Sequence, residues 1–315
     1  MLLPEYCLMP SLFDVQSYGK PHWEDKERRE IYKLYLELMI QTLLSEGIIR
    51  DLYAGSWSKL VASKNTDLKK LLQKHKQRIR PVEKVSDNRP NDDTDWLSEG
   101  IESCRRKPAS GIIAPKSLID SATPEVRSDA TFAIEAIETL HRSGLWKARS
   151  CSIRLKKNID EYLTQLEPIL KLSNKILFVD PYLNPKKDHY RDFHRILAAI
   201  TRMPRPTIQV HVAQVYDRDR GRQITSEEYE RDFREMLTQI IQEQGLEIEV
   251  FFWDDFHDRY LLSNLLDINL AHGFAISGSR PTIWTRVGKK DAISVRDEFD
   301  TKKSDFHLLH RFTVS

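Results

Sequence analysis

The chain has few of the residues and motifs that mark disulfide, metal or nucleotide chemistry. Its three cysteines, Cys7, Cys104 and Cys151, are odd in number and far apart. That pattern indicates neither a disulfide framework nor a zinc site, and fits a reducing cytoplasm. No HExxH segment, P-loop or G-x-G-x-x-G segment is present. We therefore expect no metal site, no cofactor and no nucleotide hydrolysis.

Long apolar runs are also absent. No stretch approaches the length of a membrane span, and the start, Met1–Tyr6, shows no basic segment followed by an apolar one. The expectation is a cytoplasmic protein without a membrane span. Neither sign of charge is in large excess, since 49 basic and 47 acidic residues give a formal net charge of +2. This balance excludes a uniformly basic nucleic-acid coat but allows a local basic patch.

The hydrophobic fraction of 40% across 315 residues is enough for two cored domains. Apolar residues in the N-terminal half recur at helical spacing, so residues 1–160 are predicted to form a helical domain. The helices are expected over Glu24–Glu46, Ser58–Arg78, Pro124–Gly144 and Ile159–Leu172. Residues 81–96 are rich in Pro, Asn and Asp and are predicted to form an exposed loop.

One face of the predicted helix Ser58–Arg78 is basic. It carries Lys64, Lys69, Lys70, Lys74, Lys76 and Arg78. The simpler interpretation is a solvated helix face. The alternative is a surface that contacts a phosphate backbone and releases its counterions.

Residues 161–315 show a different pattern, in which short apolar runs alternate with amphipathic helices. Ile176–Val179 is a continuous apolar run, and Ile208–Val212 and Glu247–Trp253 are predicted as the second and third strands. Thr225 and Glu228 form a capping box before a helix that Gly245 ends. Strands that alternate with helices predict an α/β domain with a mixed, mainly parallel sheet.

Ligands bind such sheets beyond the carboxyl ends of the strands, and two polar clusters fall there. Asp180 and Tyr182 follow the first strand, and residues 254–259 follow the third. In an extended segment His257 and Arg259 would share one face, with Asp258 on the other. The alternative is that His257 is a structural histidine paired with a nearby carboxylate.

The segment 257–264, HDRYLLSN, resembles the H-x-K-x4-D box of the phospholipase D superfamily, with Arg259 in place of Lys and Asn264 in place of Asp. The resemblance spans residues 170–315. It is nearest to the single-box branch of small bacterial nucleases and the C-terminal domains of microtubule-interacting-and-trafficking proteins. It implies a phospholipase D-like α/β/α fold for this half of the chain.

The resemblance also implies roles for individual residues. His257 would be a nucleophile that forms a phosphohistidine, with Arg259 as the phosphate clamp and Asn264 as the third catalytic residue. A second histidine would come from the other subunit of a homodimer. The usual downstream G-S/T-x-N segment is not in place. Candidate substrate-binding residues are Asp180, Tyr182, His272, Ser279, Arg286 and Glu298.

Three functions are compatible with these residues. The first is a metal-independent phosphodiesterase, expected to be a nuclease of a bacterial restriction or antiviral defence system, with DNA or RNA as its partner. The second is a non-catalytic module that binds phosphate groups, nucleic acid or a protein partner. The third is a structural subunit of a complex, docked through the helical N-terminal domain.

Overall fold

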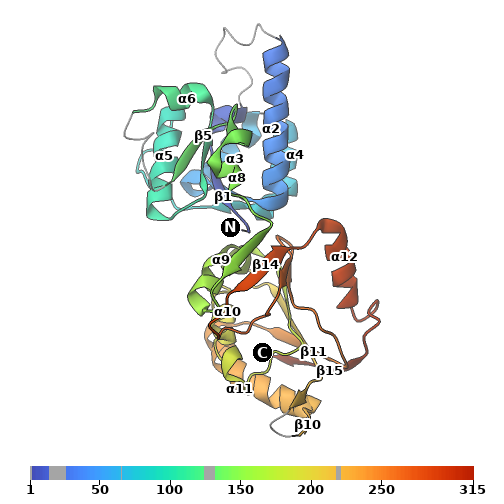
Figure 1. Ribbon diagram of the computed structural model, residues 1–315. Coiled ribbons are helices and arrows are strands. Elements are labelled where there is room, and N and C mark those ends of the chain that lie inside the picture. Colours follow the sequence, from blue (N-terminus) through green and yellow to red (C-terminus); the bar gives the residue numbers. More distant parts are fainter. Residues whose placement is uncertain (1, 14–25, 65, 124–131, 218–220) are drawn as a thin grey trace. The chain divides into compact units, whose positions relative to one another are not determined.

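The computed structural model describes residues 2–13, 26–64, 66–123, 132–217 and 221–315 (Figure 1). The chain divides into two compact units, Leu3–Ser150 and Cys151–Ser315. Both units combine helices with a β-sheet, so the protein is α/β, as the sequence predicts. In the described part of the chain, no helix combines the length and apolarity that a membrane crossing needs.

The first unit contains a five-stranded sheet in the order β3-β2-β1-β4-β5, with every neighbouring pair parallel. Its elements are β1 (Glu5–Leu8), η1 (Pro10–Phe13), α2 (Lys26–Glu46), β2 (Ile48–Asp51), α3 (Leu52–Lys64), α4 (Thr66–Lys74), η2 (Lys76–Arg78), β3 (Ile79–Pro81), α5 (Asp93–Arg106), β4 (Gly111–Ala114), α6 (Lys116–Ser121), β5 (Ala133–Ala136), η3 (Leu140–Arg142) and α8 (Gly144–Lys147).

The prediction of a helical N-terminal domain is therefore wrong. The strands of this unit are only three or four residues long, and each is too short to show a period of its own. Ile134, which we placed on a helix after Pro124, belongs to β5; residues 124–131 lie outside the described part. The helix expected over Ser58–Arg78 is divided into the end of α3, α4 and η2. Lys69 and Lys74 of its basic face are exposed.

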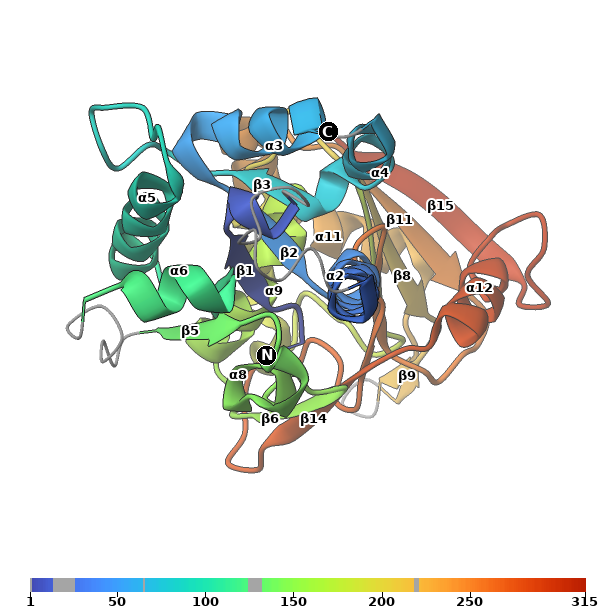
Figure 2. The same cartoon turned by 90° about the horizontal axis from the view of Figure 1, so that it is seen from above.

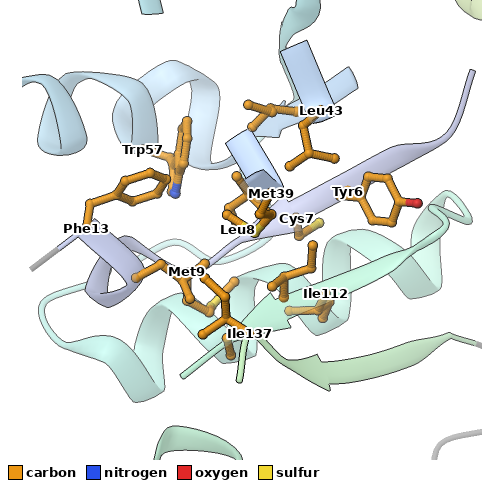
Figure 3. Close-up of a cluster of buried hydrophobic side chains, with 14 of the residues drawn as sticks. Tyr6, Cys7, Leu8, Met9, Phe13, Met39, Leu43, Trp57, Ile112 and Ile137 are labelled. Carbon is orange, nitrogen blue, oxygen red and sulfur yellow. The ribbon is translucent and has the colours of Figure 1, made fainter. Parts of the chain in front are cut away.

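Helices cover both faces of this sheet. Figures 1 and 2 show α5 and α6 on one side and α2 on the other, as expected when the strand order reverses next to β1. Figure 3 shows the core, in which Cys7 and Leu8 of β1 lie among Met39 and Leu43 of α2 and Ile112 of β4. All five of these side chains are buried.

The loop between β3 and α5 matches the predicted exposed segment, although α5 begins at Asp93, before the predicted end at residue 96. The carboxylate of Glu99 holds this loop. It accepts hydrogen bonds from the backbone N–H groups of Val85 (2.9 Å) and Ser86 (3.1 Å). Asp92 caps α5 by accepting a hydrogen bond from the backbone of Asp95.

The second unit contains an eight-stranded sheet in the order β15-β11-β8-β7-β12-β13-β14-β6, and the small hairpin β9-β10. Its elements are β6 (Ser152–Leu155), α9 (Ile159–Leu172), β7 (Lys175–Val179), η4 (Asp188–Tyr190), α10 (Phe193–Ala198), β8 (Thr207–Ala213), β9 (Tyr216–Asp217), β10 (Arg222–Gln223), α11 (Ser226–Gln244), β11 (Ile248–Trp253), β12 (Tyr260–Ser263), β13 (Ile268–Leu270), β14 (Thr282–Arg286), α12 (Lys289–Glu298) and β15 (Leu308–Val314).

The three predicted strands are β7, β8 and β11, and they pair in parallel. The sheet as a whole is mixed, as predicted. Its other neighbouring pairs are antiparallel, so the predicted "mainly parallel" arrangement holds only for β11, β8 and β7. The predicted capping box of Thr225 and Glu228 is present, and Gly245 ends α11 in a left-handed conformation. The unit begins ten residues earlier than residue 161 because β6 pairs with β14.

One face of this sheet carries α9, α10 and α11, and α12 lies over the other (Figure 1). Under α12, His211 of β8 is fully buried among aromatic rings and stacks on Phe251 with ring centroids 4.6 Å apart. Its Nδ1 accepts a hydrogen bond from Trp253 Nε1 at 3.1 Å. Burial lowers the pKa of His211 to about 3, so its imidazole is neutral.

Candidate functional site

The carboxyl ends of β7, β8 and β11 meet at one edge of the second sheet, and a cleft of about 690 Å³ opens there. Tyr182, Lys187 and His189 from the segment after β7 line it, together with Asp255 and His257 from the segment after β11. This is the edge at which parallel strands place ligands, and the edge that the sequence predicts. The first residue after β7 lies at this edge.

That residue, Asp180, is fully buried and hydrogen-bonded on both carboxylate oxygens. Oδ2 accepts a hydrogen bond from the backbone N–H of Phe274 at 2.9 Å. Oδ1 accepts from the backbone N–H of Tyr182 at 3.1 Å and from the Tyr190 hydroxyl at 3.3 Å. The carboxylate thus ties the segment after β7 to the segment after β13.

Burial also determines the protonation of Asp180. It raises the pKa of this carboxyl group from its ordinary 3.8 to about 6, although the hydrogen bonds and Arg259 act in the opposite direction. The pKa of Tyr190 is raised well above its usual value, first by burial and second by the charge of Asp180. Asp180 is therefore a buried group that titrates near neutral pH.

Gly273 is what allows the two segments to approach. It has a φ of +58°, and a Cβ placed on it would lie 2.0 Å from Asp180 Oδ2 and 2.9 Å from Arg259 Cδ. No side chain fits there, and the left-handed conformation favours glycine independently. The group that the Gly273 backbone approaches is therefore the Asp180 carboxylate.

Arg259 lies over this carboxylate at the start of β12. Its Nε is 3.8 Å from Asp180 Oδ1, and its Nη1 donates a hydrogen bond to the Ala271 carbonyl at 3.4 Å. The guanidinium carbon lies 4.7 Å from the centre of the Tyr182 ring. The Arg259 side chain is 28% exposed, so part of its planar fork of donors reaches solvent. This arrangement can present a fixed positive charge to an anion at the edge of the cleft.

His257 is much freer than Arg259. Its side chain is 78% exposed, and its Nε2 lies 3.9 Å from Asp255 Oδ2. The pairing with a nearby carboxylate that the alternative interpretation expects is thus present, on an exposed ring. Asp258 turns the other way. The pKa values of Tyr260 and Glu298 are raised there, first by burial and second by the charge of Asp258. The opposite placement of Asp258 agrees with the predicted alternation.

Two histidines and Lys157 lie near Arg259. The pKa values of His189 and His272 are both lowered, first by burial of part of each ring and then by nearby cations. Lys157 acts on both rings, and Arg259 acts on His272. The backbone N–H of Ile276 donates to the His189 carbonyl at 2.7 Å, which joins the segments that carry the two histidines. We call Lys157, His189, Arg259 and His272 the cationic cluster.

The loop 277–280 borders this cluster. A Cβ on Gly278 would lie 3.4 Å from Lys157 Nζ, which places Ser279 in an exposed loop next to the cluster. Ser279 itself makes no hydrogen bond with any residue that the structure describes. Its predicted role in substrate binding stays a prediction.

Three predicted site residues are not brought together with the others. Asn264 lies at the amino end of β7, where its Oδ1 accepts from the backbone N–H groups of Asn174 (2.8 Å) and Lys175 (3.3 Å). That is roughly 20 Å along the strands from Asp180, so the predicted catalytic role of Asn264 is wrong. The residue shapes a turn.

Arg286 and Glu298 are displaced for different reasons. Arg286 pairs with Ile268 of β13 and therefore lies three strands from β7, roughly 14 Å away. Glu298 ends α12 beside Asp258, on the opposite side of the segment from Arg259. Neither contacts the cationic cluster, so neither placement fits the predicted binding of substrate there.

Lys157, Lys187 and His189 were missed by the sequence reasoning. Lys187 and His189 are two residues apart and follow Asp180 closely in the sequence, so their place near the strand end could have been inferred. Lys157 lies between β6 and α9, and its approach depends on β6 joining the far edge of the sheet. Among the residues described, no three His, Cys, Asp or Glu side chains are grouped as metal ligands would be.

Comparison with models of known protein families finds no match, and no curated protein matches the sequence. Among solved structures, one similar chain is TrmBL2, an archaeal chromatin protein described as showing a novel mode of DNA binding. The similarity covers 78% of this chain and 82% of that chain, at 10% sequence identity and a TM-score of 0.30. A similarity at this level supports no argument about the function of this chain.

Proposed function

We propose that the cationic cluster binds the phosphate group of a phosphodiester, and that the phosphodiester belongs to nucleic acid. The observation that carries this proposal is the fixed guanidinium of Arg259, held over a buried carboxylate and flanked by Lys157 and two imidazoles. Arginine binds phosphate through two parallel hydrogen bonds, and nearby cations add to the attraction.

Lys157 strengthens the case because its charge is not balanced nearby. No carboxylate in the described part of the chain lies within ion-pair distance of its ammonium group. Tyr182 adds a second element of recognition, since its ring lines the cleft and is 40% exposed. An aromatic ring beside a phosphate-binding cation suits a nucleotide, whose base can stack while its phosphate is held.

Binding of a labelled single-stranded oligonucleotide across a series of salt concentrations tests the proposal. Lys157→Ala should weaken binding and reduce the slope of log affinity against log salt by about 1, because one phosphate contact is lost. Lys69→Ala removes the same charge from the exposed basic face of the first unit and serves as the matched control. Equal losses in the two variants would point to nonspecific attraction and contradict a site at the cluster.

Hydrolysis of the bound phosphodiester is a second candidate function, favoured by the presence of His189 and His257 in the same cleft. In this reaction a ring nitrogen of His257 attacks phosphorus, the bond to the leaving oxygen breaks, and that oxygen takes a proton from His189. Water then cleaves the phosphohistidine. A histidine from the same chain would make the homodimer expected from the resemblance unnecessary.

Cleavage assays with chelator present test the hydrolytic candidate. His257→Asn should abolish turnover of DNA or RNA without reducing affinity. His189→Asn should slow turnover most for substrates whose leaving oxygen needs a proton. Wild-type rates in His257→Asn would exclude His257 as the nucleophile. Binding without turnover in the wild-type chain would leave phosphate recognition as the function. The expected role in restriction or antiviral defence stays a prediction.

A further inference from the structure

The first unit holds two cysteines in contact. Cys7 of β1 and Cys104 of α5 are 97 positions apart in the chain, yet their sulfur atoms lie 3.6 Å apart. Both thiols are buried, whereas Cys151 is exposed and belongs to the second unit. Sequence spacing indicated no such pair, because the contact is made by packing a helix on the sheet.

A buried cation lies beside the pair. Arg50 of β2 is in register with Cys7 on the neighbouring strand, and its side chain is only 1% exposed. Its Nη1 donates to the Ser103 carbonyl at 3.0 Å, and Ser103 precedes Cys104. The pKa of Cys104 is lowered, first by the hydrogen bond with Cys7 and also by Arg50, although burial and Glu5, which pairs with Arg50, act in the opposite direction. The thiolate is the nucleophilic form of cysteine, so this environment favours reaction at Cys104.

A pocket leads from the surface to these neighbours. It has a volume of about 360 Å³, and Arg50, Arg80, Ser103, Arg106 and Lys107 line it. Neither thiol lines the pocket, but two of its lining residues adjoin them, since Arg50 is in register with Cys7 and Ser103 precedes Cys104. A peroxide is small enough to enter a pocket of this size.

We propose that Cys7 and Cys104 are a modification site, at which a peroxide converts the two thiols into an intramolecular disulfide. The Cys104 thiolate attacks one peroxide oxygen, the O–O bond breaks, and a sulfenic acid and water form. The Cys7 thiol then attacks the sulfenic sulfur, forming the S–S bond and releasing a second water. Two thiols and one peroxide thus give one disulfide and two waters.

For the bond to form, the sulfur atoms must approach from 3.6 Å to about 2.0 Å. The new bond joins β1, the central strand of its sheet, to α5, which packs on one face. Because it closes a long loop, it should restrict the unfolded chain and raise the melting temperature of the first unit. The site lies in the other unit from the cationic cluster and does not depend on the function proposed there.

The test uses the full chain with Cys151→Ser, so that only the pair remains. The reduced protein is treated with hydrogen peroxide, denatured, labelled with N-ethylmaleimide and weighed intact. We expect two labels before oxidation and none after it, with a mass lower by two hydrogen atoms. A proteolytic peptide that links Cys7 to Cys104 should appear and be lost on reduction.

The wild-type chain controls for the oxidant, because exposed Cys151 should lose its label under the same treatment. Adding Cys104→Ser to the Cys151→Ser chain removes the partner thiol, and Cys7 should then keep its label. Two labels retained by the Cys151→Ser chain, when wild-type Cys151 has fully reacted, would overturn the proposal. A gain of oxygen atoms without a cross-link would overturn it as well.

Discussion

Asp180 and Gly273 lie so close that no side chain fits between them. A Cβ on Gly273 would come 2.0 Å from Asp180 Oδ2, and the N–H of the next residue, Phe274, already donates to that oxygen. The buried carboxylate, the left-handed glycine and the Arg259 guanidinium above them form one connected arrangement. The first predictions concern this arrangement.

Gly273→Ala should destabilise the second unit by about 3 kcal/mol or more, because a left-handed conformation and a steric clash act together. Gly245→Ala is the matched control. Gly245 has a similar φ of +60°, but a Cβ there meets nothing within 4 Å, so its cost should be about 1 kcal/mol. Urea denaturation measures both variants. Equal losses would show that the contact with Asp180 is not tight.

The titration of Asp180 should appear in the pH dependence of stability. Its pKa is raised in the folded state, so the folded chain holds the proton more strongly. This contribution to the free energy of unfolding is present below pH 3.8 and is lost as pH rises through about 6, by roughly 3 kcal/mol. Asp180→Asn should remove this contribution, so the difference in free energy of unfolding between wild type and variant should change by that amount between pH 3.8 and about 6. A difference that stays constant with pH in urea titrations would assign the effect to another group.

His211 should act in the opposite direction. Its folded pKa is lowered to about 3, so the unfolded chain binds a proton that the folded chain excludes. Stability should therefore be lost as pH falls from 6.5 toward 3, at about 1.4 kcal/mol per pH unit well inside that window. His211→Gln lacks the titrating group and should flatten this decline. Denaturation at a series of pH values, compared with wild type, decides the point.

Tyr182 should distinguish nucleic acid from simple anions. If its exposed ring stacks on a base, Tyr182→Ala should weaken binding of a single-stranded oligonucleotide by about 1–3 kcal/mol, whereas Tyr182→Phe should bind almost as wild type. Binding of inorganic phosphate should change much less in both variants. Anisotropy and calorimetric titrations measure the two ligands. A loss for phosphate as large as for the oligonucleotide would argue against stacking.

The fold was predictable where its signals are local. Ile176–Val179 is a continuous apolar run, and Ile208–Val212 has apolar residues at every second position; both patterns are typical of strands with a buried face. The strands of the first unit gave no such signal, because segments such as Glu5–Leu8 are four residues long and include charged or polar members. Their stability comes from pairing with distant segments, which no local period reports.

The site was predictable in part for the same reason. Asp180, His257 and Arg259 follow recognisable strands, so their common edge could be inferred. Lys157 and His189 reach the cluster only through the pairing of β6 with β14 and the turn after β7. Asn264 was wrongly predicted to be catalytic because the segment 257–264 does not show by itself where β12 ends and the chain turns.

The central claim is that a phosphate group sits among Lys157, His189, Arg259 and His272, and titration of the histidine rings by NMR tests it most directly. In the free protein the pKa values of His189 and His272 are lowered. A bound phosphate brings negative charge to both rings, so both pKa values should rise when inorganic phosphate or a short oligonucleotide is added. The signals of His141 in the first unit should not change. If the two pKa values stay where they are while the ligand binds, the phosphate binds elsewhere and the account is wrong.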